Sequence, residues 1–253
     1  MVVLGIGLVG GAVSGFLGIG GGIVTAPLLL YVPAALGLPP LSMHVVSGLT
    51  ITQALFAGLL GAWLHGRQGT VDRKLAGVMS VVIFGASLAG AAASPLFTHK
   101  FLLGVFAALA LTAAVLIFRP GRPNEEEGYR LGSFPVSGAV GIAAGVGVLG
   151  GLVGQGGSFL LIPALTGLLR VPLRVAMGSN LVIVFFASLA GFFGKAATGQ
   201  IPFALAMALL AGVAPGSLLG IRWNHRAPVR ALRLTLGGLI LVACARMVWD
   251  LTG

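Results

Sequence analysis

The chain has 253 residues, of which 57% are hydrophobic and only 8% are charged, whereas a soluble domain of this length carries about a quarter of its residues as charged side chains. This composition excludes a water-soluble protein. The net charge of +10 does not indicate a nucleic-acid-binding protein, because such a protein needs a soluble basic face. We interpret the excess of basic residues as a sign of positively charged loops that face the cytoplasm and its anionic lipids.

Eight apolar segments follow one another along the chain. They cover about residues 1–36, 41–64, 75–97, 101–118, 134–169, 175–195, 201–221 and 231–251. Six of them have the length of a single membrane crossing, which takes ~20 residues. The first and the fifth are each near 36 residues long and are interrupted by glycines at their centres. Each of these two either crosses once or folds back as a hairpin, whose arms of ~15–17 residues are at or below the spanning minimum.

The distribution of lysine and arginine distinguishes the two alternatives. If all eight segments crossed once, the basic residues would divide eight against seven. If the two long segments are hairpins, twelve lie on one side and only Lys100, Lys195 and Arg246 on the other. We therefore expect two hairpins and six crossings, with both termini outside. The basic loops at 65–74, 119–133 and 222–233 would face the cytoplasm.

The two glycine interruptions match each other. Residues 15–27 read GFLGIGGGIVTAP, and residues 151–163 read GLVGQGGSFLLIP. Two further matches follow in the same order: SGLTI at 47–51 with SNLVI at 179–183, and GASLAG at 85–90 with PGSLLG at 215–220. These matches indicate that the chain arose by duplication.

The duplication predicts the organisation of the chain. Residues 1–118 form a first transmembrane repeat, residues 119–133 a cytoplasmic linker rich in Pro, Gly and charge, and residues 134–253 a second transmembrane repeat. Each repeat holds one hairpin and three crossings, an odd number, so the second repeat enters from the opposite face of the membrane. The prediction is an all-α polytopic membrane protein built as an inverted repeat of two halves, as in many secondary transporters.

The glycine breaks have a chemistry that suits an anion. A helix that restarts after a break presents free backbone N–H groups and the positive end of its dipole. The expected binding residues are Gly18, Gly20, Gly21 and Gly22 in the first break, and Gly154, Gln155, Gly156, Gly157 and Ser158 in the second. The alternative interpretation is that these glycines only allow close helix packing.

Polar residues in the second and sixth segments occupy matching places. Ser47, Thr50 and Gln53 lie close enough to share one helix face, and Ser179 and Asn180 are among their counterparts. Ligand contact and simple bonding to the backbone are equally consistent with these residues. Lys195 lies at the end of the sixth segment, where we expect it to extend to the membrane interface, although it could attract an anion.

Acidic side chains are missing from the apolar segments, apart from Asp250 at the very end of the last one. Cation sites in membranes usually need a carboxylate, so a cationic substrate is disfavoured. The single Cys244 lies in an apolar run and provides neither a disulfide framework nor a zinc site. We expect no metal and no cofactor.

Both breaks, GIGGG at 18–22 with Pro27 and GQGG at 154–157 with Pro163, are followed by SGLT and GSNL. In these features the chain resembles the sulfite exporter TauE/SafE family, also called the sulfonate uptake permease family. The resemblance implies transport, often export, of sulfite or sulfonates such as sulfoacetate across the bacterial inner membrane. Gln155 and Ser158 stand where the first copy has Ile19 and Gly22, so the site should be asymmetric.

Three function classes remain at this point. A secondary anion transporter is the leading hypothesis, and an anion channel on the same scaffold is the alternative. An intramembrane enzyme is disfavoured because the four histidines lie near segment ends, away from Ser158. The sequence leaves open whether the chain forms a homo-oligomer.

Overall fold

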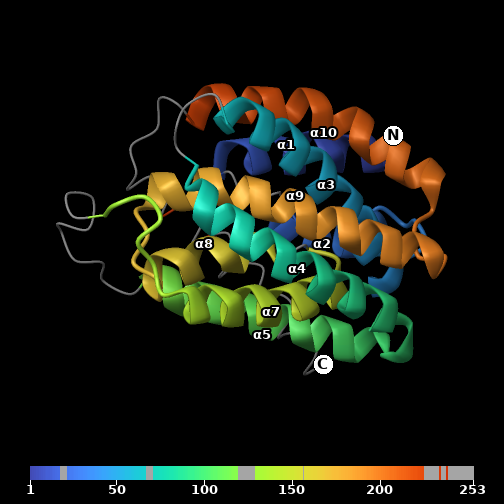
Figure 1. Ribbon diagram of the computed structural model, residues 1–253. Coiled ribbons are helices and arrows are strands. Elements are labelled where there is room, and N and C mark those ends of the chain that lie inside the picture. Colours follow the sequence, from blue (N-terminus) through green and yellow to red (C-terminus); the bar gives the residue numbers. More distant parts are fainter. Residues whose placement is uncertain are drawn as a thin grey trace.

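The computed structural model of the chain describes residues 1–17, 22–66, 71–118, 129–155 and 157–224, together with Leu234 and Gly238. Over these residues the regular secondary structure is helical and contains no strand, as the apolar segments predicted. The helices form a bundle (Figure 1). In chain order they are α1 (Val2–Leu17), α2 (Gly22–Ala35), α3 (Met43–Gly66), α4 (Arg73–Ala93), the 3-10 turn η1 (Ser94–Leu96), α5 (His99–Phe118), α7 (Val136–Val153), α8 (Ser158–Gly167), α9 (Leu173–Ala197) and α10 (Phe203–Asn224).

Five of the described helices are long and apolar enough to cross a membrane, namely α3, α4, α7, α9 and α10. The apolar parts described for α1, α2 and α5 are shorter. Helix α7 has 18 residues, so the first arm of the second hairpin is longer than the sequence suggested and reaches the length of a crossing. The eighth apolar segment falls outside the described residues, except for Leu234 and Gly238.

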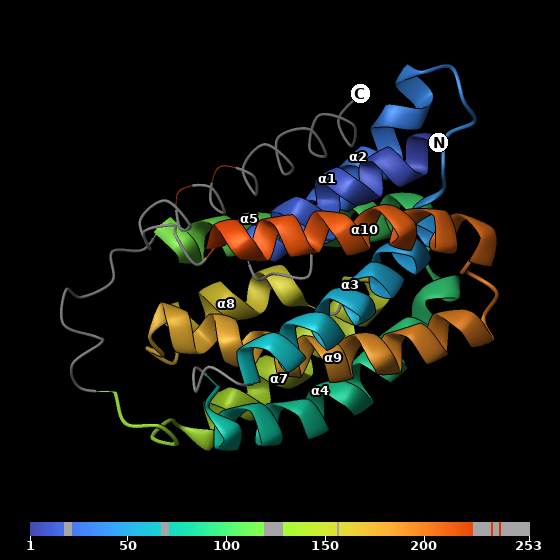
Figure 2. The ribbon, with the colours of Figure 1, turned by 90° about the horizontal axis from the view of Figure 1, so that it is seen from above.

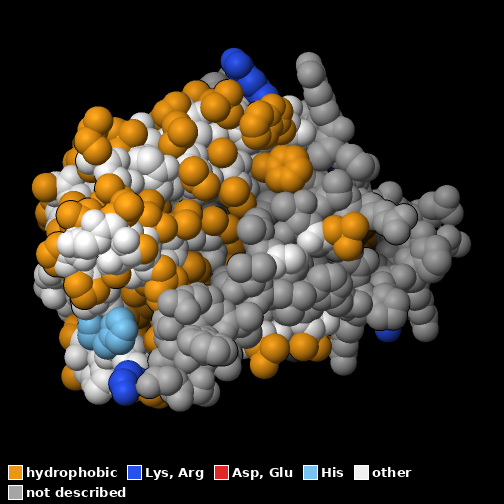
Figure 3. All heavy atoms as spheres, turned by 180° about the vertical axis from the view of Figure 1, so that it is seen from behind, with side chains coloured by type: hydrophobic (Ala, Val, Ile, Leu, Met, Phe, Trp, Pro, Cys, Tyr) orange, Lys and Arg blue, Asp and Glu red, His pale blue; other side chains and the backbone are white. Residues whose placement is uncertain are grey.

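The surface of the bundle is apolar. Val81 is 78% exposed and Phe203 is 62% exposed, and both lie on helices long enough to cross a bilayer. Figure 3 shows hydrophobic side chains over most of the described surface on one face, with lysine and arginine near its edges. Lipid tails solvate such a surface, whereas water does not.

Hydrogen bonds between loops define the two ends of the bundle. The backbone N–H of Asp72, just before α4, donates to Ser179 Oγ near the start of α9 at 3.0 Å. The N–H of Gly132, four residues before α7, donates to Asp72 Oδ2 at 2.6 Å. Helices α4, α7 and α9 therefore all begin at one end, which we call the Asp72 end.

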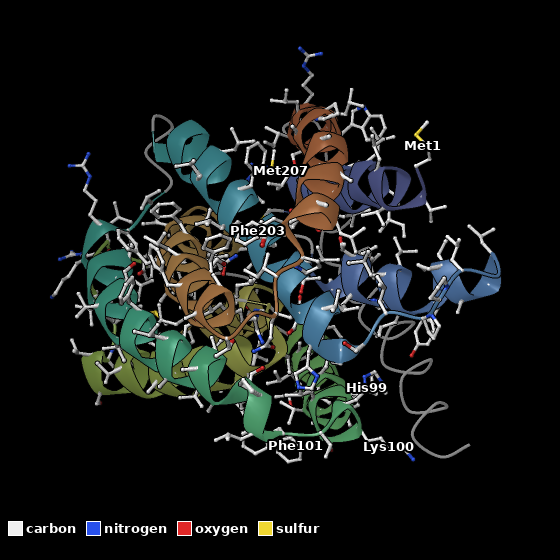
Figure 4. The ribbon with its side chains drawn as sticks, turned by 90° about the vertical axis from the view of Figure 1, so that its right-hand side faces the viewer. Met1, His99, Lys100, Phe101, Phe203 and Met207 are labelled. Carbon is white, nitrogen blue, oxygen red and sulfur yellow. The ribbon has the colours of Figure 1, made fainter. Side chains whose placement is uncertain are left out.

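At the opposite end, which we call the His99 end, the N–H of Met43 at the start of α3 donates to His99 Nδ1 at the start of α5, at 2.8 Å. Figure 4 faces this end and shows Met1, His99 and Phe203, so α1, α5 and α10 also begin there. The pair α1–α2 begins and finishes at the His99 end, whereas the pair α7–α8 begins and finishes at the Asp72 end. Both paths can be followed in Figure 2. Each over-long segment therefore returns to its starting end.

Small residues bring α1 and α10 into close parallel contact. A Cβ on Gly11 would lie 2.8 Å from Val213 Cα, and a Cβ on Gly15 would lie 3.0 Å from Ile221 N. No larger residue fits such an approach of two backbones. Three glycines of α10 meet the backbone of α1 in the same way: Gly212, Gly216 and Gly220.

Helices α4 and α7 form a second contact of the same kind. The space beside Gly151 of α7 is filled by the backbone carbonyl of Ser87 of α4, and the space beside Gly15 of α1 is filled by that of Ser217 of α10. The sequence matches align Gly15 with Gly151 and Ser87 with Ser217. Equivalent residues of the two halves therefore make equivalent contacts.

Candidate functional site between two helix breaks

The second break is a turn that depends on two glycines. Gly154 ends α7 with φ 75°, and the N–H of Gln155 bonds the carbonyl of Gly150 at 2.9 Å, which closes the helix with a left-handed cap. Gly157 has φ 73° and precedes α8. Residues with a Cβ rarely adopt this conformation, so both positions require glycine. Gly156 and the side chain of Ser158 lie outside what the structure describes.

The first break meets the second. Gly18, Gly20 and Gly21 fall outside the described residues, but Gly22 is the first residue of α2 and is buried. The space that a Cβ on Gly22 would occupy is filled by Oε1 of Gln155. The amide of the second break therefore lies directly on the start of the helix that follows the first break. The sequence predicted that the two breaks approach each other, without fixing which residues touch.

Two further buried polar side chains approach each other at α1, one of them a turn along α2 from Gly22 and the other a turn along α3 from Thr50. Thr25 in α2 and Gln53 in α3 are both 0% exposed. Both reach toward Gly10 of α1, where Thr25 Oγ1 fills the Cβ space and Gln53 Nε2 lies 3.4 Å from it. Neither side chain has a hydrogen-bond partner among the described residues.

Gln53 was expected at the site from its place on the face shared with Ser47 and Thr50. Thr25 was missed, although its position one turn after Gly22 inside an apolar run was a usable signal. An unpaired buried amide or hydroxyl costs about 1–3 kcal/mol, so both groups are candidates for contact with a polar ligand.

Ser47 and Thr50 lie against the second break and support it. Thr50 Oγ1 donates to the carbonyl of Gly154 at 2.9 Å, and the backbone of Ser47 fills the space beside the same glycine. The Ser47 hydroxyl donates to the carbonyl of His44 at 2.8 Å. These contacts hold the break in place. Both hydroxyl groups already donate their protons to backbone carbonyls.

Ser179 and Asn180 lie in the second turn of α9. Ser179 accepts the Asp72 N–H at the Asp72 end, as described above. Asn180 is fully buried beside it in sequence. The described contacts therefore join Gln155 to Gly22 and bring Thr25 and Gln53 to Gly10. Ser47 and Thr50 lie against the second break, and Ser179 lies beside Asp72 at the beginning of α4.

Among the described residues, the acidic side chain is that of Asp72, and its carboxylate accepts several hydrogen bonds. It accepts from the N–H groups of Lys74, Leu75 and Gly132 and from the hydroxyl of Tyr129 at 2.6–3.1 Å. Burial alone would raise the pKa of Asp72, but these four hydrogen bonds outweigh it and lower the pKa below its ordinary value. Burial and the Asp72 carboxylate raise the pKa of Tyr129. This cluster attaches the end of the linker to α4.

Lys195 differs from its expected position. Its side chain is 0% exposed and points into the bundle, so it does not extend to the interface. The polar run Thr198-Gly199-Gln200 directly after the helix was a usable signal, because it provides hydrogen-bonding groups that a buried lysine needs. No group of three or more His, Cys, Asp or Glu side chains within the described ranges is placed to hold a metal ion.

The sequence matches the family described as "Sulfite exporter TauE/SafE" over residues 3–247, nearly the whole chain. The chain belongs to the TauE/SafE family. Its relatives are named as membrane transporters and not as enzymes, and sulfite export is the activity for which the TauE/SafE family is named.

Relatives of this TauE/SafE protein from three organisms match it over 93–96% of its length. "Probable membrane transporter protein YunE" of Bacillus subtilis is 28% identical over 94% of each chain. A "Probable membrane transporter protein" of Xylella fastidiosa is 28% identical over 96% of this chain and 92% of its own. "Probable membrane transporter protein MJ0441" of Methanocaldococcus jannaschii is 21% identical over 93% of this chain and 90% of its own. No solved structure matches the chain.

Proposed function

We propose that this protein exports a small sulfur-containing anion, such as sulfite, sulfoacetate or another organosulfonate, across the bacterial inner membrane. The anion binds between the two helix breaks. The observation that carries the proposal is the contact of Gln155 with Gly22, because it joins the two breaks into one site beside the unpaired amide of Gln53.

The chemistry of these groups suits an oxyanion. The start of α2 presents backbone N–H groups and the positive end of a helix dipole. The amides of Gln53 and Gln155 and the hydroxyl of Thr25 add neutral hydrogen-bond donors. A sulfite or sulfonate group carries three oxygens that accept such bonds from several directions at once. A site of this kind contacts the anion through neutral donors and without a direct salt bridge, so the anion can also leave.

Charge supports an anion over a cation. Of the five acidic residues, the structure describes Asp72. Its carboxylate lies at one end of the bundle, where it accepts four hydrogen bonds. The polar groups beside the breaks are amides and hydroxyls, and the helix start adds positive potential. A cation at this place would meet the wrong end of the dipole.

We further propose that residues 1–118 and 134–253 are inverted repeats joined by a cytoplasmic linker at 119–133. The equivalent contacts of Gly15 with Ser217 and of Gly151 with Ser87 support this arrangement. So do the two hairpins, which start from opposite ends of the bundle. The distribution of the basic residues supports an orientation with the Asp72 end in the cytoplasm and both termini outside. Transport would then proceed by movement of one half against the other around the breaks.

Export from proteoliposomes tests the proposal. Purified protein is reconstituted, the vesicles are loaded with sulfoacetate or sulfite, and efflux is followed with and without an inside-negative potential. Each elementary charge that leaves gains ~2.3 kcal/mol per 100 mV, so efflux should accelerate with the potential. Efflux no faster than from protein-free vesicles would contradict the proposal. Saturable counterflow indicates a carrier, whereas unitary currents indicate an anion channel.

A further inference from the structure

Lys195 is a buried lysine held by three neutral groups. It lies near the end of α9, at the His99 end, where α4 and α7 also end. Its Nζ donates to Ser94 Oγ at 2.8 Å, to Gln200 Oε1 at 3.1 Å and to the carbonyl of Leu152 at 3.2 Å. Leu152 lies three residues before Gln155, so the ammonium contacts the last turn of α7, directly before the second break.

The hydrogen bonds around Lys195 show that all three neighbours present oxygen lone pairs. The hydroxyl of Thr198 donates to backbone carbonyls, so its oxygen accepts from Nε2 of Gln200 at 2.8 Å. That contact turns Gln200 Oε1 toward Lys195, and the same Oε1 accepts the proton of Ser94 at 2.9 Å. Three acceptors match the three N–H donors of an ammonium group, whereas a neutral amine has only two.

This ammonium has no carboxylate near it in the described part of the chain. Asp72 precedes α4 and Ser94 follows it, so the 21 residues of α4, ~30 Å at 1.5 Å each, separate the carboxylate from Lys195. A charge buried without a counter-ion is costly. The carbonyl of Leu152 belongs to the negative end of the α7 dipole and offsets only about half an elementary charge. Within the described ranges, nothing else offsets the positive potential beside the second break.

We propose that Lys195 is the fixed counter-charge for the transported anion and sets the preference of the site for divalent over monovalent anions. This inference rests on the proposed function. The three neutral acceptors hold the ammonium in place without neutralising it, so its charge acts on an anion at Gln155 through the low-dielectric interior. The attraction is twice as large for a dianion as for a monoanion.

The test compares two sulfonates in reconstituted vesicles. Sulfoacetate carries two negative charges and methanesulfonate carries one. Lys195→Met should raise the KM for sulfoacetate about tenfold more than the KM for methanesulfonate, because only the charge-dependent part of binding is lost. Lys195→Arg should keep the ratio of the two KM values within about twofold of the wild-type ratio. Equal changes in both KM values for Lys195→Met would overturn the inference and leave a packing role.

Gln200→Glu keeps Lys195 and provides an independent variant if Lys195→Met does not fold. It places a carboxylate of the same size beside the ammonium, so the preference for the dianion should fall in the same way. Lys100→Met is the matched control, since Lys100 is exposed at the edge of the same end (Figure 4) and its loss should leave the ratio unchanged. An unchanged ratio in Gln200→Glu would also overturn the inference. If the wild-type protein moves neither of these sulfonates nor sulfite, the proposed function itself is wrong and the inference falls with it.

Discussion

Gln155 Oε1 occupies the space beside Gly22 in which any other residue would place its Cβ. These two residues lie more than 130 positions apart in the chain and belong to the two different glycine breaks. Their contact means that the start of α2 is shaped by a side chain from the second half of the molecule. A ligand held at one break is therefore within reach of groups from both halves.

Gly22→Ala should reduce transport about tenfold or more, because its Cβ displaces the Gln155 amide and small displacements at a site are costly. The protein should still fold, since the atom that must move is the end of a flexible side chain. Sulfoacetate efflux and size-exclusion chromatography measure the two effects. Gly5→Ala, where a Cβ meets nothing within 4 Å, is the control and should transport normally. Normal transport by Gly22→Ala would place the anion elsewhere.

Gln53→Leu should separate function from stability. The buried amide has no partner among the described residues, so an apolar side chain of similar size should raise the free energy of unfolding by about 1 kcal/mol. Transport should fall about tenfold, because the lost hydrogen bond to the anion is worth about 1.4 kcal/mol. Thermal unfolding in detergent and sulfoacetate efflux provide the two readouts.

Ser80→Ala is the matched control for Gln53→Leu. Ser80 in α4 is also buried, and its hydroxyl also lacks a partner in the described ranges. It lines a groove on the outer surface between α4 and α9, away from the breaks. Its removal should leave transport unchanged. A loss of transport as large as in Gln53→Leu would show that neither result reports on the site.

Asp72→Asn should cost about 2 kcal/mol of unfolding free energy, because charge-assisted hydrogen bonds from its donors are lost. The folded-state pKa of Asp72 is lowered, so its contribution is fully present above the ordinary value of 3.8 and is lost as the pH falls through the lower folded-state pKa. The difference in stability between wild type and Asp72→Asn should be constant from pH 7 to about pH 5 and shrink in more acidic solution. Thermal unfolding at several pH values measures it, and a difference that grows on acidification would contradict the assignment.

Gly15→Val and Gly151→Val should destabilise the protein to a similar degree, because each forces apart two backbones that touch directly, by overlap with Ser217 in one half and Ser87 in the other. The fraction of monodisperse protein after heating in detergent is the measurement. Gly85→Val in α4, where a Cβ meets nothing within 4 Å, should behave as wild type. A strong effect at only one of the first two positions would argue against equivalent halves.

Single cysteines can determine the orientation. In a Cys244→Ala background, Lys100→Cys should react with a membrane-impermeant maleimide added outside cells, whereas Arg130→Cys should react only after permeabilisation. Both side chains are exposed, and they lie at the His99 end and the Asp72 end respectively. The opposite pattern would reverse the proposed orientation and make the termini cytoplasmic.

The class and helical segmentation of this protein follow from its composition and charge order. A chain with so few charges has no stable soluble state, and runs of ~20 apolar residues satisfy their backbone groups in lipid only as helices. The basic residues indicated two hairpins, because this topology leaves few of them, such as Lys100 and Lys195, on the side opposite the basic loops. Positively charged loops resist translocation and stay in the cytoplasm. The matching glycines of the two breaks also predicted where the helices would be interrupted.

Only the tertiary structure decided which polar residues meet. Sequence position put Gln53 and Ser179 in the same group, but packing brought Gln53 to Gly10 and took Ser179 to Asp72. The sequence signals at Thr25 and Lys195 did not say which groups these side chains meet, and packing decided that. The physical reason is that a hydrophobic pattern specifies which segments are buried, whereas the pairing of side chains depends on how closely the backbones approach. In this protein that approach is set by glycines such as Gly22 and Gly154, whose empty Cβ positions are filled by residues distant in the chain.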